Sequence, residues 1–143
     1  MARIQRELMV PHSAAQMYSL VNDVEHYSDF LPWCVSSRIL HRDSSSVSAS
    51  LSFAKGSMQK SFSTKNTLMP PGQIHMTLLE GPFKHLSGMW TFHEIASEQC
   101  RVALDLEFEF SNRILAMMFG PMFHKIAQTM VVSFSKQANQ VYA

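Results

Sequence analysis

The chain has 143 residues, of which 46% are hydrophobic and 16% charged, and its formal net charge is +1. This length suits one folded domain, expected over residues 1–143, with enough apolar side chains for a sizeable core. The near-neutral charge excludes a global field that would recruit nucleic acid or an anionic membrane.

Cysteine usage and the N-terminal stretch indicate the compartment. Cys34 and Cys100 lie in no CxxC pair and near no histidine cluster of metal-ligand spacing, so we expect free thiols, although one disulfide remains open. The first residues (MARIQRELMV) contain no apolar run of signal-peptide length, and no segment approaches the roughly 20 apolar residues that span a bilayer. We therefore expect a cytoplasmic protein, at most peripheral at the inner membrane, with no metal site.

The first elements in the chain are one strand and two short helices. Residues 3–10 alternate weakly and indicate a strand, which Pro11 ends. Ser13 and Gln16 have the spacing of a capping box and predict a helix over residues 13–22. Asp23 is placed to cap a second helix, which carries His26, Tyr27 and Phe30 and stops before Pro32.

Strand follows strand from Ser36 to Phe110. Alternating apolar residues, separated by turn sequences such as Pro70-Pro71-Gly72 and Gly81-Pro82, predict a meander of antiparallel strands. The predicted strands cover residues 36–43, 46–54, 57–69, 73–80, 85–94 and 100–110.

The last third of the chain dominates the organisation. In residues 101–110 (RVALDLEFEF) alternate side chains are apolar, which predicts a strand with one buried face. Apolar residues then recur three or four apart up to Val141, which predicts a helix of roughly thirty residues, about 45 Å long. Ser111 or Asn112 can cap its start, and Gly120-Pro121 predicts a kink or short break inside it.

This order of elements predicts an α+β helix-grip fold. A curved, seven-stranded antiparallel sheet would wrap around the long C-terminal helix, with two short helices after strand 1. The methionine-rich and phenylalanine-rich helix either closes a filled core or, with the sheet, encloses a cavity for an apolar ligand. The residues expected to line such a cavity are Leu31, Trp33, Phe62, Met76, Leu78, Phe83, Trp90, Phe92, Leu106, Phe108, Met118, Phe119, Met122 and Phe123. Thr64 and Asn66 are the rare polar members of the inward-facing set.

Charged residues are distributed unevenly. No Asp or Glu follows Asn112, and residues 36–66 carry five basic side chains against Asp43 alone. His75, His85 and His93 fall opposite the inward face and are expected in water. Asp105, Glu107 and Glu109 form an acidic ladder on the outer face, either shifting one another's pKa or, as we favour, pairing with Lys or Arg of a neighbouring strand.

Two loops place large apolar residues beside prolines. One contains Phe30 to Cys34, and the other contains Gly81 to Phe83. Such loops either pack against the end of the long helix or form the rim of a cavity that touches a membrane surface to load a lipid.

No convincing catalytic constellation is present. The sequence lacks the GxSxG, P-loop, GxGxxG and HExxH patterns and any paired Cys-His set. A pocket whose lining is almost purely apolar binds ligands more readily than it catalyses a reaction, so we expect no enzyme and no required cofactor.

Three separated segments resemble the bacterial coenzyme Q-binding, START-like family. They are DVEHYSDFLPWC from Asp23, EGPF from Glu80 with Leu86, Gly88, Trp90 and Phe92, and FEFSNR from Phe108 with the later Gly120-Pro121. The resemblance runs from about residue 3 to residue 140. It implies the helix-grip fold.

The resemblance also implies function. One expectation is non-catalytic binding of ubiquinone or a related isoprenoid lipid, supporting respiration. The alternative is the ribosome-association toxin type of this family, which binds the large ribosomal subunit and blocks subunit association. Strong RNA binding normally uses a concentrated basic patch, which a net charge of +1 does not favour. More distant relatives are polyketide cyclases, which we place third because no polar pocket residues suited to that reaction are evident.

Overall fold

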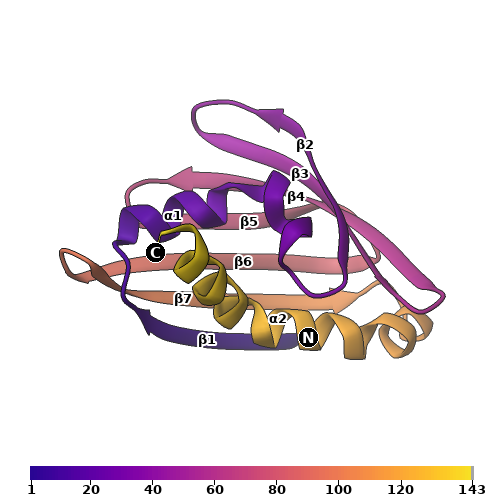
Figure 1. Cartoon of the computed structure of the whole chain (residues 1–143). Helices are drawn as coiled ribbons and strands as arrows, with labels where there is room; N and C mark the ends of the chain where they lie inside the picture. Colours follow the sequence, from indigo (N-terminus) through magenta and orange to yellow (C-terminus); the bar gives the residue numbers. More distant parts are fainter. Residues whose placement is uncertain (143) are drawn as a thin grey trace.

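The computed structural model of the protein describes residues 1–142 and consists of one sheet, two short helices and one long helix (Figure 1). The order of elements is the predicted one. The bounds are β1 Ala2–Val10, α1 Ala14–Asn22, η1 Val24–Asp29, β2 Cys34–Arg42, β3 Ser46–Lys55, β4 Met58–Met69, β5 Gln73–Glu80, β6 Phe83–Ala96, β7 Gln99–Phe110 and α2 Arg113–Val141.

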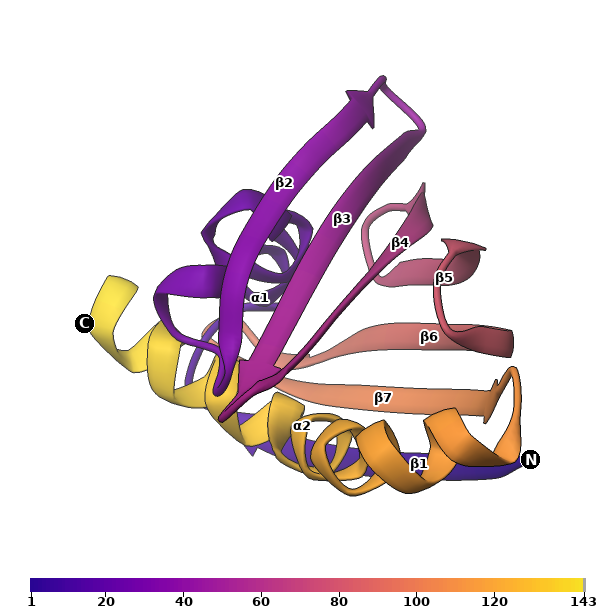
Figure 2. The ribbon, with the colours of Figure 1, turned by 90° about the vertical axis from the view of Figure 1, so that its right-hand side faces the viewer.

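The sheet has seven antiparallel strands in the order β1-β7-β6-β5-β4-β3-β2, which confirms the predicted meander. The first and last strands pair with each other, from Ala2 opposite Phe108 to Val10 opposite Cys100. Figure 2 shows the strong curvature of the sheet, in which β2, β3 and β4 stand at a steep angle to β6 and β7. α2 lies against β1 and β7.

Alternation along the strands sets the two faces of the sheet. In β7 the side chains of Val102, Leu104 and Leu106 are buried, because they face the helix across the core. The acidic ladder of β7 lies on the opposite face and is paired: Arg3 binds Asp105 at 2.7 Å, and Lys84 lies 3.7 Å from Glu109. Pairing with neighbouring strands is therefore confirmed, and β7 is an interior strand rather than an edge.

The two short helices follow β1 as predicted, with one difference. Ser13 accepts a hydrogen bond from the Gln16 amide, and the Gln16 side chain accepts one from the Ser13 amide, so the capping box of α1 is confirmed. The second element, η1, is a 3-10 helix that Asp23 does not cap. The Asp23 carboxylate instead pairs with His26 at 2.7 Å, which removes it from the helix amides.

The long helix α2 has 29 residues and begins at a cap. The side chain of Asn112 accepts a hydrogen bond from the Leu115 amide at 2.9 Å. The helix is unbroken through Pro121, so the break offered as an alternative to a kink does not occur. No helix within residues 1–142 combines the length and the hydropathy that crossing a bilayer requires.

The inner face of α2 differs from the prediction in its first turns. Phe119, Met122 and Phe123 are buried against the sheet, whereas Met117 and Met118 point to solvent. Nearly every residue of this stretch is apolar, so the helical period alone does not define which side faces the core.

The helices close the core near the C-terminal half of α2. The rings of Tyr27 and Phe30 each lie 5.1 Å from the ring of Phe134. Nearby, the Tyr142 hydroxyl donates to the Gln16 carbonyl at 3.0 Å, which ties the end of α2 to α1.

Candidate functional site

The space between α2 and the sheet is largely filled. The larger interior cavity has a volume of about 50 Å³, and a second gap beside it has about 20 Å³. An engineered apolar cavity of about 150 Å³ is needed to hold benzene, so neither space holds an aromatic ring or a prenyl chain as it stands. A larger ligand requires side chains to move.

The larger cavity lies over the middle of the sheet, under the centre of α2. Its walls are apolar except for Thr64 and Asn66. The lining residues are Val24, Tyr27, Leu51, Phe53, Phe62, Thr64, Asn66, Met76, Leu86, Trp90, Leu106, Phe123, Ile126, Ala127 and Met130.

Small residues and flexible side chains make this space adaptable. Gly88 leaves room inside the sheet, since a Cβ there would lie 2.7 Å from Met76 Cε and 2.9 Å from Leu106 Cδ1. Ala127 contributes only a methyl group from α2, and Met76 and Met130 line opposite walls with unbranched thioethers. Methionine changes rotamer at low cost, so these two side chains are the ones that can enlarge the cavity.

The polar feature of the cavity is a hydrogen-bonded pair on β4. The Thr64 hydroxyl donates to Asn66 Oδ1 at 3.1 Å, and both side chains are buried, Asn66 to 5% exposure. Within residues 1–142 the Asn66 Nδ2 group makes no hydrogen bond, and if the amide is assigned the other way round the oxygen is left in its place. The cavity therefore contains an unused hydrogen-bonding group.

Aromatic rings fill the space between the cavity and the start of α2. Phe123 is at their centre, with ring centroids of Phe108 at 4.7 Å, Phe83 at 4.9 Å and Phe62 at 5.9 Å. Edge-to-face packing of this kind excludes water and leaves only the smaller gap.

The residues predicted to line a cavity fall into three groups. Phe62, Met76, Trp90, Leu106 and Phe123 line the larger cavity, and Phe62, Phe83, Phe119, Met122 and Phe123 line the smaller gap. The remainder line neither space: Leu31, Trp33, Leu78, Phe92, Phe108 and Met118.

The structure adds lining residues that the sequence prediction did not name. Ile126, Ala127 and Met130 continue the spacing of Met122 and Phe123 along α2, so the helical period was a signal for them. Leu51 and Phe53 share the alternating inner face of β3. Tyr27 carries no such signal, because its place depends on how η1 docks on α2.

Both apolar loops pack against α2. Phe30 lies on Phe134, and Phe83 lies on Phe123. Leu31 and Cys34 are buried, and Trp33 adopts φ 61° with Lys55 Nζ 4.7 Å from its ring. Packing of both loops against α2 is therefore confirmed, while Pro82 and Phe83 also bound the smaller interior gap.

Most basic side chains within residues 36–66 each contact a different partner. Arg42 lies 3.5 Å from Glu25, Lys55 lies over Trp33, and Lys60 lies 5.4 Å from the Phe119 ring centroid. Lys65 is on the outer face of β4 and exposed. They do not form one concentrated patch.

The histidines expected in water differ in their surroundings. His93 is exposed, and His75 lies 3.3 Å from the Ser87 hydroxyl. His85 is partly buried, and its Nε2 is shielded from solvent with no hydrogen-bond partner within residues 1–142, so the expectation is wrong for this residue.

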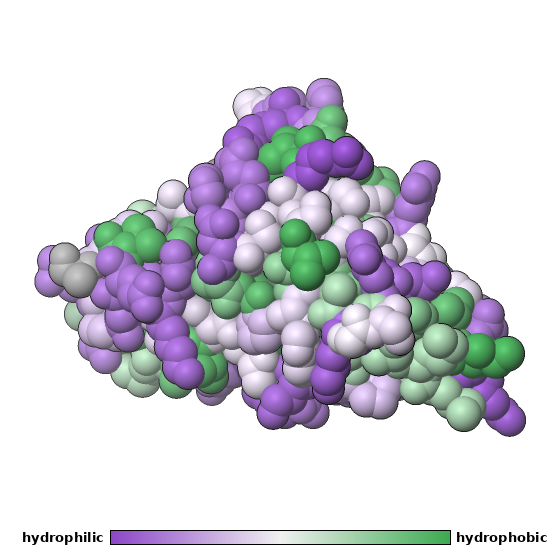
Figure 3. All heavy atoms as spheres, turned by 45° about the vertical axis from the view of Figure 1, so that its right-hand side comes forward, coloured by the Kyte–Doolittle hydropathy of each residue, from purple (hydrophilic) through white to green (hydrophobic). Residues whose placement is uncertain are grey.

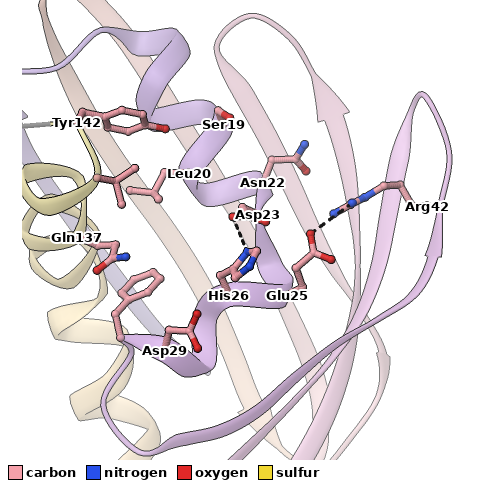
Figure 4. A pocket seen from close by; sticks show the side chains of 12 residues that line it. Ser19, Leu20, Asn22, Asp23, Glu25, His26, Asp29, Arg42, Gln137 and Tyr142 are labelled. Carbon is pink, nitrogen blue, oxygen red and sulfur yellow. Dashed lines mark hydrogen bonds and ion pairs between the residues drawn. The ribbon is translucent and has the colours of Figure 1, made fainter.

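A polar surface hollow of about 530 Å³ opens beside α1, η1 and the end of α2. In Figure 4, Asp23 and His26 face each other, and Glu25 points to Arg42. The ligand atoms of Asp23, Glu25 and His26 lie within 4.8 Å of one another. The Asp23 carboxylate accepts a hydrogen bond from the His26 ring and raises the pKa of His26, which opposes metal binding because a metal needs the neutral imidazole. We interpret the group as surface ion pairs.

Comparison with known proteins gives three kinds of similarity. The family described as "Polyketide cyclase / dehydrase and lipid transport" matches residues 10–135. The ribosome association toxin RatA of Escherichia coli K12 is 42% identical over 143 residues, covering 100% of this chain and 90% of that protein. The coenzyme Q-binding protein COQ10 homolog B, mitochondrial, of Xenopus laevis is 28% identical over 134 residues, covering 91% of this chain and 55% of that protein.

A solved structure shares the fold. The Zhui aromatase/cyclase of Streptomyces sp. R1128 superposes with a TM-score of 0.87 at 16% identity, covering 99% of this chain and 96% of that chain. At this identity the similarity concerns the arrangement of the sheet and helices.

Proposed function

The chain belongs to the polyketide cyclase / dehydrase and lipid transport family, and we propose that within it the protein is a ribosome-association factor of the RatA type. It acts by binding the large ribosomal subunit and thereby hindering subunit association, without catalysis. The observation that carries this proposal is the 42% identity to the Escherichia coli toxin along the whole chain.

The filled interior supports a binding role that uses the surface. The two interior spaces together are smaller than a ubiquinone head group requires. Within residues 1–142 no carboxylate, imidazole or thiol lines either of them. The Tyr27 phenol donates to the Val21 carbonyl, and its burial raises its pKa, so it is a poor acid–base group.

The outer face of β3, β4 and β5 is the surface best suited to RNA. No acidic residue occurs between Ser44 and Leu79, whereas the other half of the sheet carries the acidic ladder. This outer face presents Lys65 among the hydroxyl groups of Ser48, Ser52, Ser61, Thr67 and Thr77. Lysine and hydroxyl side chains contact phosphate oxygens, which fix a protein on RNA without reading its sequence.

Sedimentation with purified large subunits tests the proposal. We expect the wild-type protein to co-sediment and the binding to weaken as salt rises. Lys65→Glu should weaken binding and lower the slope of the log–log salt dependence by about one. Lys125→Glu makes the same charge change on the outer side of α2 and is the matched control. Absence of co-sedimentation at low salt, or equal effects of the two variants, would refute this assignment.

Binding of a hydrophobic molecule such as ubiquinone or a related isoprenoid lipid is the second candidate, as a carrier that supports respiration. The observation that favours it is the unused polar atom of Asn66 inside an otherwise apolar cavity. A quinone carbonyl can accept from its amide once Met76 and Met130 move aside. Such a ligand would be bound without a required cofactor.

Native mass spectrometry after extraction from membranes tests this second function. Ala127→Val should fill much of the 50 Å³ cavity and abolish a co-purifying quinone, because a valine adds two carbons to the cavity wall. Ala116→Val, on the exposed side of the same helix, is the control. Quinone retained by a folded Ala127→Val variant would place the ligand elsewhere.

A further inference from the structure

The first turns of α2 expose large apolar side chains to solvent. Ile114 is 69% exposed, Met117 72% and Met118 48%, although Phe119 and Met122 on the other side of the same turns are buried. In Figure 3 these turns form an apolar surface at the lower right, at the end of the molecule where α2 begins. Three such neighbours on one helix are more than scattered surface residues, and they mark a contact surface.

Basic residues surround this apolar tip, which we define as Ile114, Met117 and Met118. Arg113 and Lys125 are exposed on α2 itself, and Lys60 lies over the ring of Phe119. Lys84 follows the β5–β6 turn, whose residue Pro82 accepts a hydrogen bond from the Ser111 amide. The acids nearby are Glu80 at the end of β5 and Glu109, which is already paired with Lys84 and with the N-terminal amine.

We propose that the apolar tip is a docking surface for a membrane that contains anionic lipids. Ile114, Met117 and Met118 enter the boundary between head groups and acyl chains, and the surrounding cations meet lipid phosphates. This is a peripheral contact, since α2 does not qualify as a membrane-crossing helix. It does not depend on the proposed ribosomal function, which uses the opposite side of the sheet.

The chemistry of the tip favours a bilayer over RNA. Exposed isoleucine and methionine gain little from a sugar-phosphate backbone, and RNA platforms use aromatic rings and arginines. A bilayer stabilises both the apolar tip and the surrounding cations, because the apolar side chains leave water while lysine and arginine bind anionic head groups. The two loops for which membrane contact was one of two alternatives pack against α2, so the proposed contact lies on α2 itself.

The position of the tip is consistent with exchange of apolar molecules. The smaller interior gap is bounded by Phe119 and Met122 of α2 and by Pro82 and Phe83 of the β5–β6 turn. It therefore lies directly behind the residues that would enter the lipid. Membrane docking requires no ligand in the core, and it can be measured without one.

Vesicle flotation tests the proposal with the full chain. The probes are vesicles of phosphatidylcholine alone and of phosphatidylcholine with phosphatidylglycerol. We expect the wild-type protein to float with the anionic vesicles. Met117→Glu should reduce the partition coefficient at least tenfold. Lys125→Glu should reduce it at least fivefold on anionic vesicles, because losing one cation near such a surface costs about fivefold and the new carboxylate adds repulsion.

A matched control keeps the test specific. Met9→Glu makes the same substitution at a 50% exposed methionine at the far end of β1, and it should float like the wild type. The proposal is overturned if the wild-type protein does not float with anionic vesicles, or if Met117→Glu and Met9→Glu behave alike. It is also overturned if Met117→Glu abolishes co-sedimentation with large subunits while flotation is unchanged, since the tip would then contact the ribosome.

Discussion

The Thr64 hydroxyl donates to Asn66 Oδ1 across 3.1 Å, two positions apart on β4, inside the core. This bond leaves one terminal atom of the Asn66 amide without a partner within residues 1–142. A polar pair in this position can orient a ligand that reaches it.

The first prediction separates the two members of this pair. Thr64→Val should lower the free energy of unfolding by about 1–3 kcal/mol, because Asn66 Oδ1 then loses its donor in the core. The double variant Thr64→Val with Asn66→Leu should recover at least the wild-type value, because both buried polar groups are gone. Urea unfolding followed by tryptophan fluorescence measures this. Thr67→Val, on the exposed side of β4, is the control, and a double variant weaker than Thr64→Val contradicts the argument.

The second prediction concerns the glycine in the cavity wall. Gly88→Ala places a methyl group 2.7 Å from Met76 Cε and 2.9 Å from Leu106 Cδ1, so it should destabilise the fold by about 1–3 kcal/mol. Adding Met76→Ala should restore part of this loss, because the closest atom is removed. Thermal unfolding of the single and double variants measures the coupling. Additive losses of stability would mean that the added methyl group clashes with Leu106 and the backbone rather than with Met76.

The third prediction concerns the two thiols. Burial raises the pKa of Cys34 to about 11, and it also raises the pKa of Cys100. Both are buried and free, so neither should react readily with an aromatic disulfide reagent at pH 8 in the native protein. Both should react at once in guanidinium chloride. A native thiol that reacts at the unfolded rate would show that its part of the core opens often.

The sequence predicted the architecture because its strands each keep one face in the core. Apolar and polar side chains alternate without interruption from Val102 to Phe110, which indicates a strand with one buried face. The structure places this strand inside the sheet, between β1 and β6. The Ser13 capping box likewise fixes the start of α1 through local hydrogen bonds. Both the strand alternation and the capping box depend only on residues close in sequence or paired with an adjacent strand.

The interior of the site was less accessible to prediction. Whether α2 and the sheet enclose a cavity depends on how the rings of Phe62, Phe83 and Phe123 pack against one another. The periodicity of apolar residues in the sequence does not contain this information. Met118 was predicted to face inward because all six residues from Ile114 to Phe119 are apolar, so the pattern fits either side of the helix. Phe119 packs into the core, and this tertiary contact turns Ile114, Met117 and Met118 toward solvent.

The last prediction concerns the turn between β2 and β3. The Oδ1 atom of Asp43 accepts from the amides of Ser45 and Ser46 at 2.8 Å and from the Ser45 hydroxyl at 3.0 Å. The Ser45 amide, its hydroxyl and the Ser46 amide lower the pKa of Asp43 to about 2. In the unfolded chain an aspartate has a pKa of about 3.9, so the folded state binds the proton more weakly.

The sign of the effect follows from this difference. The ionised carboxylate stabilises the fold above about pH 4, and this stabilisation is lost as the pH falls through about 2. Asp43→Asn keeps an acceptor of the same shape but no charge. Its thermal midpoint should lie below that of the wild type at pH 7, and the two midpoints should converge as the pH approaches 2. NMR titration of the Asp43 carboxyl carbon measures the pKa directly. A gap that is the same at pH 7 and at pH 2 would mean that hydrogen-bond geometry, and not charge, stabilises this turn.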